Sequence, residues 1–363
     1  MLEKINHKNA PKEIIDALVT LYHQGKFDDV LSRSSHLIKQ YPHTPVLHNI
    51  LGAISFEKGN KEAAVEHFRK VIELQPGHPH AYNNLGATLI DMCEYQEAKI
   101  NLEKAIELKP DYTEAYNNLG NVFKELEEYN KAIVQYKKAI ELNPHYYEAM
   151  NNIASVLQKK NEYNEAKKFL NCAIKFNPKL ADAYNNLGKL YLNLGNFQKA
   201  EEEIKRAINL NTNNYAYHKD LGIIYLKMGK YCLSKKSFER VIDLNPKFSE
   251  AYANIADILI KKGLIIDAYV YLSKSKFLDK VSDQTYFNLD KIHNLSLNYL
   301  YHYRDNFLHK YYGKIDKKDV KKFLISLLEI SEPINYKNLF DNIYKNLSKK
   351  NVSIVKSGKK KNN

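Results

Sequence analysis

The chain has 363 residues, a formal net charge of +13, and 28 Tyr and 14 Phe but no Trp. With 44% hydrophobic residues, this composition excludes a globally disordered protein and allows a sizeable core. The cysteines Cys93, Cys172 and Cys232 form no CxxC pair, which excludes a zinc knuckle and a disulfide framework and fits a reducing compartment. The sequence shows no signal-peptide stretch and no run of about 18 apolar residues, so we expect a cytoplasmic protein without a membrane span.

The positive charge is concentrated toward the C-terminus, where 16 Lys and Arg stand against 8 Asp and Glu from Asp283 onward. Such a segment can attract nucleic acid or an anionic membrane, but no recognition motif accompanies it. We therefore attribute most of the charge to a general Lys- and Asn-rich composition. We do not expect nucleic acid as a partner.

Proline marks a regular period along most of the chain. It recurs on a 34-residue grid, with Thr212 in the one missing place, at Pro42, Pro76, Pro110, Pro144, Pro178 and Pro246. A Leu-Gly or Ile-Ala pair follows the same grid at residues 51–52, 85–86, 119–120, 153–154, 187–188, 221–222 and 255–256. A fixed period of this length indicates stacked supersecondary units.

Residues 78–111 show what one unit contains. Two helices are predicted from apolar spacing, the first from Tyr82, Leu85, Gly86 and Leu89 and the second from Ala98, Leu102, Ala105 and Ile106. The turn between the two helices holds glycine in other units, at Gly59, Gly195, Gly229 and Gly263. Glycine can end the first helix in a left-handed conformation at little cost. Pro110 ends the second helix because proline lacks an amide donor.

The unit, with Ala-Tyr-Asn-Asn-Leu-Gly, then Glu-Ala, then Lys-Ala-Ile-Glu-Leu-x-Pro, resembles the tetratricopeptide repeat over about residues 11–282. The resemblance implies an all-α fold. It implies a right-handed superhelical solenoid of about eight 34-residue helix-turn-helix repeats plus C-terminal helices. It also implies that the first helices line a concave groove that takes up peptides or partner helices.

In chain order we expect four regions. Residues 1–44 form a degenerate N-terminal capping repeat, because Ser34 stands where Leu102 packs in the third unit. Residues 45–282 form the tandem solenoid, because one unit alone cannot bury both of its faces. Residues 283–348 form a C-terminal helical cap, with apolar residues at helical spacing around 320–328 and 339–347. Residues 349–363 form a basic disordered tail, since no apolar period continues there.

A column of side-chain amides is the candidate binding site. At about 100° per residue, Asn84 points away from the face that carries Tyr82 and Leu85. The column continues through the groove as Asn84, Asn118, Asn152, Asn186, Asp220 and Asn254. An amide both donates and accepts, which suits the main chain of an extended peptide. The column is similar to the asparagine ladder of the protein O-GlcNAc transferase family. The alternative is that Asn is merely the commonest family residue there.

Two mixed columns flank the amides. One holds His80, Glu114, Glu148, Asp182, Ala216 and Glu250, and the other Asp91, Glu125, Lys159, Asn193, Lys227 and Lys261. The charge therefore shifts from acidic to basic along the groove. The carboxylate clamp of chaperone-binding relatives needs a Lys early in a first helix and an Asn four residues later. Here the residue four positions after Lys219 is Ile223. We therefore do not expect a binder of chaperone tails.

No catalytic motif, phosphate loop or dinucleotide fingerprint occurs. The histidines His43, His48, His78 and His80 lack a Cys or carboxylate set that would complete a metal site. We assign the Tyr-rich stretch 299–312 to capping rather than to base stacking. The sequence therefore predicts a scaffold, not an enzyme, that binds a protein or peptide without catalytic residue, cofactor or metal.

The alternative function is a substrate-recruiting arm related to bacterial glycosyltransferase or sulfotransferase proteins. Only 81 residues follow Ser282, which is short for a complete catalytic domain.

Overall fold

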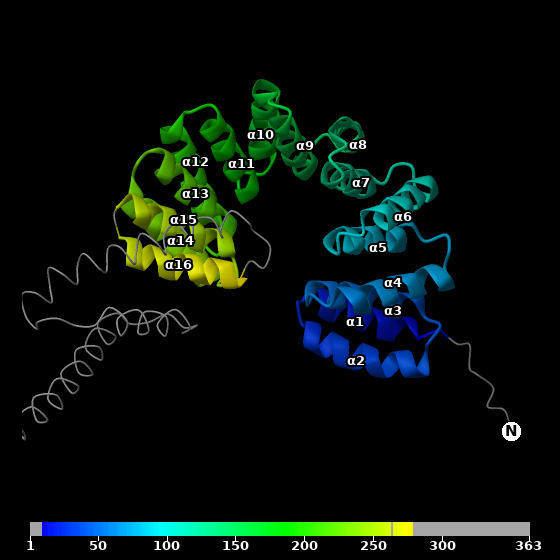
Figure 1. Cartoon of the computed structure of the whole chain (residues 1–363). Helices are drawn as coiled ribbons and strands as arrows, with labels where there is room; N and C mark the ends of the chain where they lie inside the picture. The colour runs from blue at the N-terminus through cyan, green and yellow to red at the C-terminus, as the bar shows by residue number, and fades with distance from the viewer. Residues whose placement is uncertain (1–8, 263, 279–363) are drawn as a thin grey trace, which may run out of the picture. The chain divides into compact units, whose positions relative to one another are not determined.

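The computed structural model describes residues 9–262 and 264–278 (Figure 1). In these ranges it contains sixteen helices and no strand: α1 (Lys12–His23), α2 (Phe27–Gln40), α3 (Pro45–Glu57), α4 (Lys61–Leu74), α5 (Pro79–Asp91), α6 (Tyr95–Leu108), α7 (Thr113–Glu125), α8 (Tyr129–Leu142), α9 (Tyr147–Lys159), α10 (Tyr163–Phe176), α11 (Ala181–Asn193), α12 (Phe197–Leu210), α13 (Tyr215–Lys227), α14 (Tyr231–Leu244), α15 (Ser249–Lys261) and α16 (Ile265–Leu278). The expected all-α solenoid of about eight helix pairs is confirmed. Gly263 and the predicted cap and tail, 283–348 and 349–363, lie outside the described residues.

The chain divides into two compact units, residues 1–212 and 213–363. In the first unit, α1 to α12 pack in chain order, each helix against the next. In the second unit, α13 to α16 pack in the same way. The division falls directly after Thr212, where the proline period is broken.

The turns inside the first seven helix pairs all use a residue with positive φ. Four are glycines, the expected Gly59, Gly195 and Gly229 together with Gly25, but three are Cys93, Glu127 and Asn161, with φ of 63°, 59° and 61°. Hydrogen bonds hold this conformation. The Glu128 amide donates to the Phe123 carbonyl at 2.8 Å, which closes the end of α7. The turn geometry therefore persists where the glycine signal is absent.

The two helices of a pair pack tightly at one small residue. A Cβ added at Gly86 would lie 2.6 Å from Cγ of Leu102 on the facing helix, closer than packed atoms come. The same relationship recurs in Gly52 and Phe68, Gly120 and Tyr136, Gly188 and Ile204, and Gly222 and Phe238. In the first pair the sizes are exchanged, because the buried residues at these positions are Leu18 and Ser34. The first repeat therefore keeps one large and one small residue at this level.

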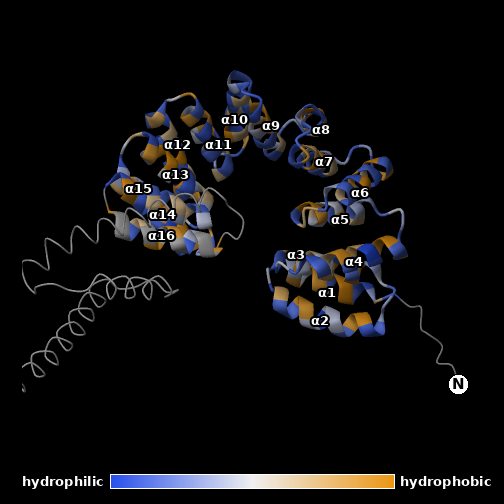
Figure 2. Cartoon of the chain, in the orientation of Figure 1, coloured by the Kyte–Doolittle hydropathy of each residue, from blue (hydrophilic) through white to orange (hydrophobic). Residues whose placement is uncertain are grey.

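Apolar and polar stretches alternate along the helices, as Figure 2 shows by colour. In the first unit a continuous cluster extends from Phe68 through Leu102 and Tyr136 to Ile153. Burying each such large side chain contributes about 1.5 to 3 kcal/mol. No helix among the described residues combines the length and the apolar character needed to span a membrane.

Candidate peptide-binding surface on the first helices

The predicted amide column occupies the sixth position of successive odd-numbered helices from α5 to α15. Its members are Asn84 in α5, Asn118 in α7, Asn152 in α9, Asn186 in α11, Asp220 in α13 and Asn254 in α15. We call the four asparagines of residues 1–212 the ladder. The other two residues belong to the second unit.

Each ladder asparagine makes a hydrogen bond to the preceding repeat. The Nδ2 atom of Asn118 donates to Oδ1 of Asn83 at 3.0 Å. The same bond joins Asn152 to Asn117 at 3.0 Å, Asn186 to Asn151 at 2.8 Å and Asn84 to Asn49 at 3.4 Å. The acceptors Asn83, Asn117 and Asn151 are only 7 to 8% exposed. A buried amide oxygen needs such a donor, so the ladder stabilises the stack as well as lining a surface.

This arrangement corrects the expectation that the ladder lies wholly off the packing face. All four side chains are half-buried. A helical wheel describes one helix by itself. It omits the first helix of the neighbouring repeat, whose side chains come within hydrogen-bonding distance. The Oδ1 atoms of the four ladder residues take part in no hydrogen bond among the described residues. Each rung therefore keeps one acceptor for a partner.

The first asparagine of each Asn-Asn pair was missed by the sequence analysis. Asn83 and Asn117 accept the bridges although neither belongs to the predicted column. The signal that could have revealed them is the repeated dipeptide itself. Donor and acceptor are 35 residues apart, one more than the repeat length.

In the second unit the predicted column continues with different chemistry. Asp220 is buried, at 7% exposure, and one of its carboxylate oxygens lies 3.7 Å from Nζ of Lys219. Asn254 donates from Nδ2 to the Glu250 carbonyl of its own helix at 2.9 Å. Its amide hydrogen bond therefore stays within one helix, in contrast to the bridges of the ladder.

Carboxylates stand one helical turn before three ladder residues. Glu114, Glu148 and Asp182 precede Asn118, Asn152 and Asn186 by four positions, which places each acid and amide on the same helical face. Glu114 and Asp182 are exposed and Glu148 is half-buried. The ladder surface of α7, α9 and α11 thus carries acceptors and negative charge together.

Two tyrosines that precede these helices share the same surroundings. Burial raises the pKa of the Tyr146 phenol, and Glu148, Glu114 and Tyr112 raise this pKa further. Burial, followed by Glu114, raises the pKa of Tyr112 to about 12, while a hydrogen bond from Asn83 opposes the rise. The mutual influence places both acids and both phenols in one neighbourhood.

Sequence comparison agrees with this repeating geometry. Models described as tetratricopeptide repeat or TPR repeat match residues 46–78, 94–126, 113–146, 135–168, 154–195, 181–214 and 220–248. Together the matches cover about half of the chain. The chain belongs to the tetratricopeptide repeat (TPR) family. The predicted family resemblance is thereby confirmed, whereas the finer similarity to O-GlcNAc transferase repeats stays a prediction. No curated protein is a significant match to the sequence.

Solved structures with TPR folds resemble this chain. A chain of the APC/C hetero-tetramer Cut9-Hcn1 has a TM-score of 0.61 and 16% identity, over 80% of this chain and 57% of that one. A TPR protein from Parabacteroides merdae has a TM-score of 0.53 and 18% identity, over 71% and 98%. PilF of Pseudomonas aeruginosa has a TM-score of 0.50 and 21% identity, over 59% and 96%. This TPR protein spans little more than half of the Cut9-Hcn1 chain, and identities this low show the fold alone.

The histidines considered as metal ligands lie at TPR helix junctions. His48 places Nδ1 3.3 Å from Nδ1 of His67 on α4, and its Nε2 lies 3.0 Å from the Pro42 carbonyl. His80 places Nδ1 2.7 Å from the Tyr112 hydroxyl. In the part of the chain that the structure describes, no three His, Cys, Asp or Glu side chains are grouped to hold a metal ion.

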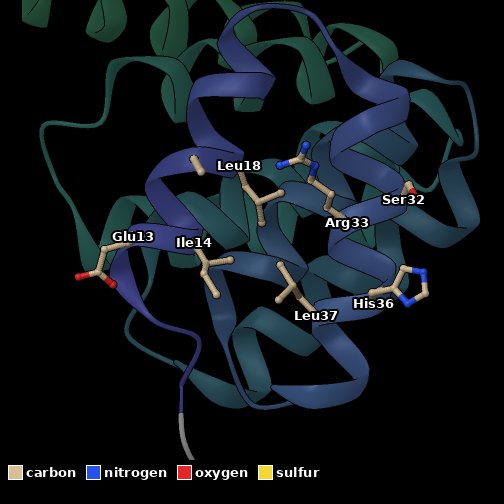
Figure 3. Close-up of a pocket in the computed structure, with 8 residues that line it drawn as sticks. Glu13, Ile14, Leu18, Ser32, Arg33, His36 and Leu37 are labelled. Carbon is tan, nitrogen blue, oxygen red and sulfur yellow. The ribbon is translucent and has the colours of Figure 1, made fainter.

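A pocket lies apart from the ladder, between α1 and α2 of the first TPR (Figure 3). Ile14, Leu18 and Leu37 face one another in it, and Arg33 and His36 also line it. Its lining includes no ladder residue. We therefore keep it separate from the candidate binding surface.

Proposed function

We propose that this TPR protein is a non-catalytic scaffold that binds an extended segment of another protein along the ladder. One observation carries the proposal: the Oδ1 atoms of Asn84, Asn118, Asn152 and Asn186 are half-buried acceptors without a hydrogen bond among the described residues. Backbone amides of an extended peptide are the donors that such a row can satisfy, whatever the side chains.

The inter-repeat bonds also favour binding. Because Nδ2 of Asn118 and Asn152 is already held at 3.0 Å, these side chains are ordered before a partner arrives. Binding then costs less side-chain entropy. Each amide contact contributes only about 0.5 to 1.5 kcal/mol net, so we expect affinity to depend on several rungs together.

Two double variants separate a role of the ladder in partner binding from its role in holding the repeats together. Asn118→Ala with Asn152→Ala removes two half-buried acceptors and two inter-repeat bonds. Asn83→Ala with Asn117→Ala removes the same two bonds but leaves the Oδ1 acceptors of Asn118 and Asn152 in place. A partner captured with the full chain and identified by crosslinking would then be titrated against both variants.

We expect the first variant to lose about 1 to 3 kcal/mol of binding free energy, as two amide contacts would contribute. We expect the second variant to bind like the wild type. Equal losses would assign the asparagines to stacking alone. Unchanged affinity in both variants would place recognition on another surface.

We place the scaffold in the cytoplasm. Cys93, Cys172 and Cys232 are exposed and form no disulfide, and a reducing compartment keeps cysteines in that state. The alternative of a transferase-associated arm concerns residues beyond Ser282, which lie outside the described residues. No observation on the described residues favours it.

A further inference from the structure

The ladder surface is richer in hydrogen-bond acceptors than in donors. The Nδ2 groups of Asn118, Asn152 and Asn186 already donate to the preceding repeat, while their Oδ1 atoms accept nothing among the described residues. Each Nδ2 keeps a second N–H, and each Oδ1 has two lone pairs, so the assembled stack offers a partner more acceptor than donor capacity. A partner that supplies hydrogen-bond donors therefore suits it best.

Two carboxylates on this surface stand without a counter-ion. Among the described residues, neither Glu114 nor Glu148 forms an ion pair, and neither carboxylate accepts a hydrogen bond. Acids on the second helices differ. Glu107 pairs with Lys104 at 2.8 Å and Glu141 with Lys138 at 3.1 Å. Unpaired acids in a chain of net charge +13 make the part of the surface around Glu114 and Glu148 locally negative, which favours a positive group of a partner there.

The protein itself shows how a cation fits here. Nζ of Lys109 lies 4.7 Å from the centroid of the Tyr112 ring, a favourable cation–π distance. Tyr146 occupies the equivalent place one repeat later, but Asn143 stands where Lys109 would be. The Tyr146 hydroxyl makes no hydrogen bond among the described residues. Among the described residues, no Lys or Arg lies over the Tyr146 ring as Lys109 lies over Tyr112, so this position beside Glu148 and Glu114 can take a cation from a partner.

We infer that the partner segment is basic, with Lys or Arg at about every third residue, and that Glu114 and Glu148 bind its cations while Asn118 and Asn152 bind its main chain. Packed helices lie about 8 to 10 Å apart, and an extended peptide in the polyproline II conformation rises about 3.1 Å per residue with three residues per turn, so that every third side chain faces the same way. One repeat therefore corresponds to about three peptide residues. The inference rests on the proposed function and adds the chemical class of the partner.

The test uses the full chain and labelled peptides about twelve residues long, enough for four rungs at this spacing. One peptide repeats Lys-Ala-Ser, and two others replace Lys by Gln or by Glu. A fourth has the composition of the first with all Lys adjacent. Fluorescence anisotropy at about 50 mM salt, where screening is weak, gives the affinities.

We expect the Lys-Ala-Ser peptide to bind about tenfold more tightly than the Gln peptide, the adjacent-Lys peptide to bind less tightly than the spaced one, and the Glu peptide to bind weakest. Glu114→Gln with Glu148→Gln should weaken binding of the Lys-Ala-Ser peptide about fivefold. Glu107→Gln with Glu141→Gln removes the same charge from the second helices and should leave that affinity unchanged. Raised salt should reduce the difference between the Lys and Gln peptides.

Carboxylates in a first helical turn also interact favourably with the helix dipole. If Glu114→Gln with Glu148→Gln lowers the melting temperature but not peptide affinity, the acids serve the helices and the inference is wrong. If the Gln peptide binds as tightly as the Lys peptide, and Asn118→Ala with Asn152→Ala weakens both, the proposed function stands and the basic partner is refuted. If no peptide binds, both fail.

Discussion

The ring of Tyr136 crosses directly over Gly120, so that a Cβ added to the glycine would lie 2.5 Å from Cε1 of the ring. Tyr136 is fully buried, and its hydroxyl donates to Oδ1 of Asn121 at 2.8 Å. The ring is therefore held at both ends. The tight packing of α7 against α8 at this point depends on the absence of one methyl group.

Gly120→Ala should destabilise the protein by about 1 to 3 kcal/mol, because the anchored ring cannot move aside without strain. Urea denaturation would show this as a lower midpoint. Gly77→Ala is the matched control, since a Cβ there meets nothing within 4 Å. Adding Tyr136→Leu to Gly120→Ala should restore part of the loss, because Ala154 and Leu170 occupy the equivalent positions in the next repeat. An unchanged midpoint in Gly120→Ala would contradict the close contact.

Removing the donor and removing the acceptor of the Asn152–Asn117 hydrogen bond should differ in their effect on stability. Asn152→Ala leaves the buried Oδ1 of Asn117 without its donor, which should cost about 1 to 3 kcal/mol. Asn117→Ala leaves only the half-buried Asn152 amide unpaired, which water can reach, and should cost about 0.5 to 1.5 kcal/mol. Chemical denaturation of the two variants would compare them. A larger loss of stability in Asn117→Ala than in Asn152→Ala would show that the unpaired Oδ1 of Asn117 does not determine the destabilisation.

Replacing a strained turn residue should stabilise the protein. Glu127 adopts φ of 59° between α7 and α8, a conformation that costs a non-glycine residue about 1 to 2 kcal/mol. Glu127→Gly should therefore raise the unfolding free energy by about 0.5 to 1 kcal/mol after the entropy of glycine is included. Gly59→Ala should lower it, although a Cβ there meets nothing within 4 Å. Thermal melts with the same sign for both variants would refute the backbone argument.

Stability should fall in mild acid because of the His48–His67 pair. Burial lowers the pKa of both imidazoles below the ordinary value of 6.5, and the charge of His48 lowers that of His67 further. Lys70 opposes protonation of His48, whereas Glu66 and Glu73 favour it. The unfolded state therefore binds protons first, so stability is complete above pH 6.5 and is lost as the pH falls below it.

Melting temperatures at about pH 7.5 and pH 5.5 bracket the ordinary histidine pKa and would measure this loss. His67→Gln removes one titrating ring and the repulsion between two charged rings. The drop in melting temperature should be smaller in this variant than in the wild type. An equal drop would assign the acid sensitivity to other groups.

The repeat architecture could be predicted because its signals are local and recur. Pro110 and its equivalents end second helices, and the Leu85-Gly86 type of pair marks first helices. Each repeat therefore contains the local signals that define its two helices, and the structure confirms the helix pairs. The amide column was found because a helical wheel needs only the spacing within one helix. The wheel failed where a second helix enters the environment, as the burial of Asp220 shows.

The sequence by itself determined that the chain forms paired helices with small residues between them, because helix spacing, turn residues and proline stops act over a few residues. Only the tertiary structure decided which atoms of the ladder remain available. The Nδ2 of Asn118 meets Asn83 from 35 residues away, a distance that no local pattern reports. With one N–H of each ladder amide used inside the stack, the free Oδ1 atoms, the second N–H groups and the unpaired Glu114 and Glu148 give the surface its polarity.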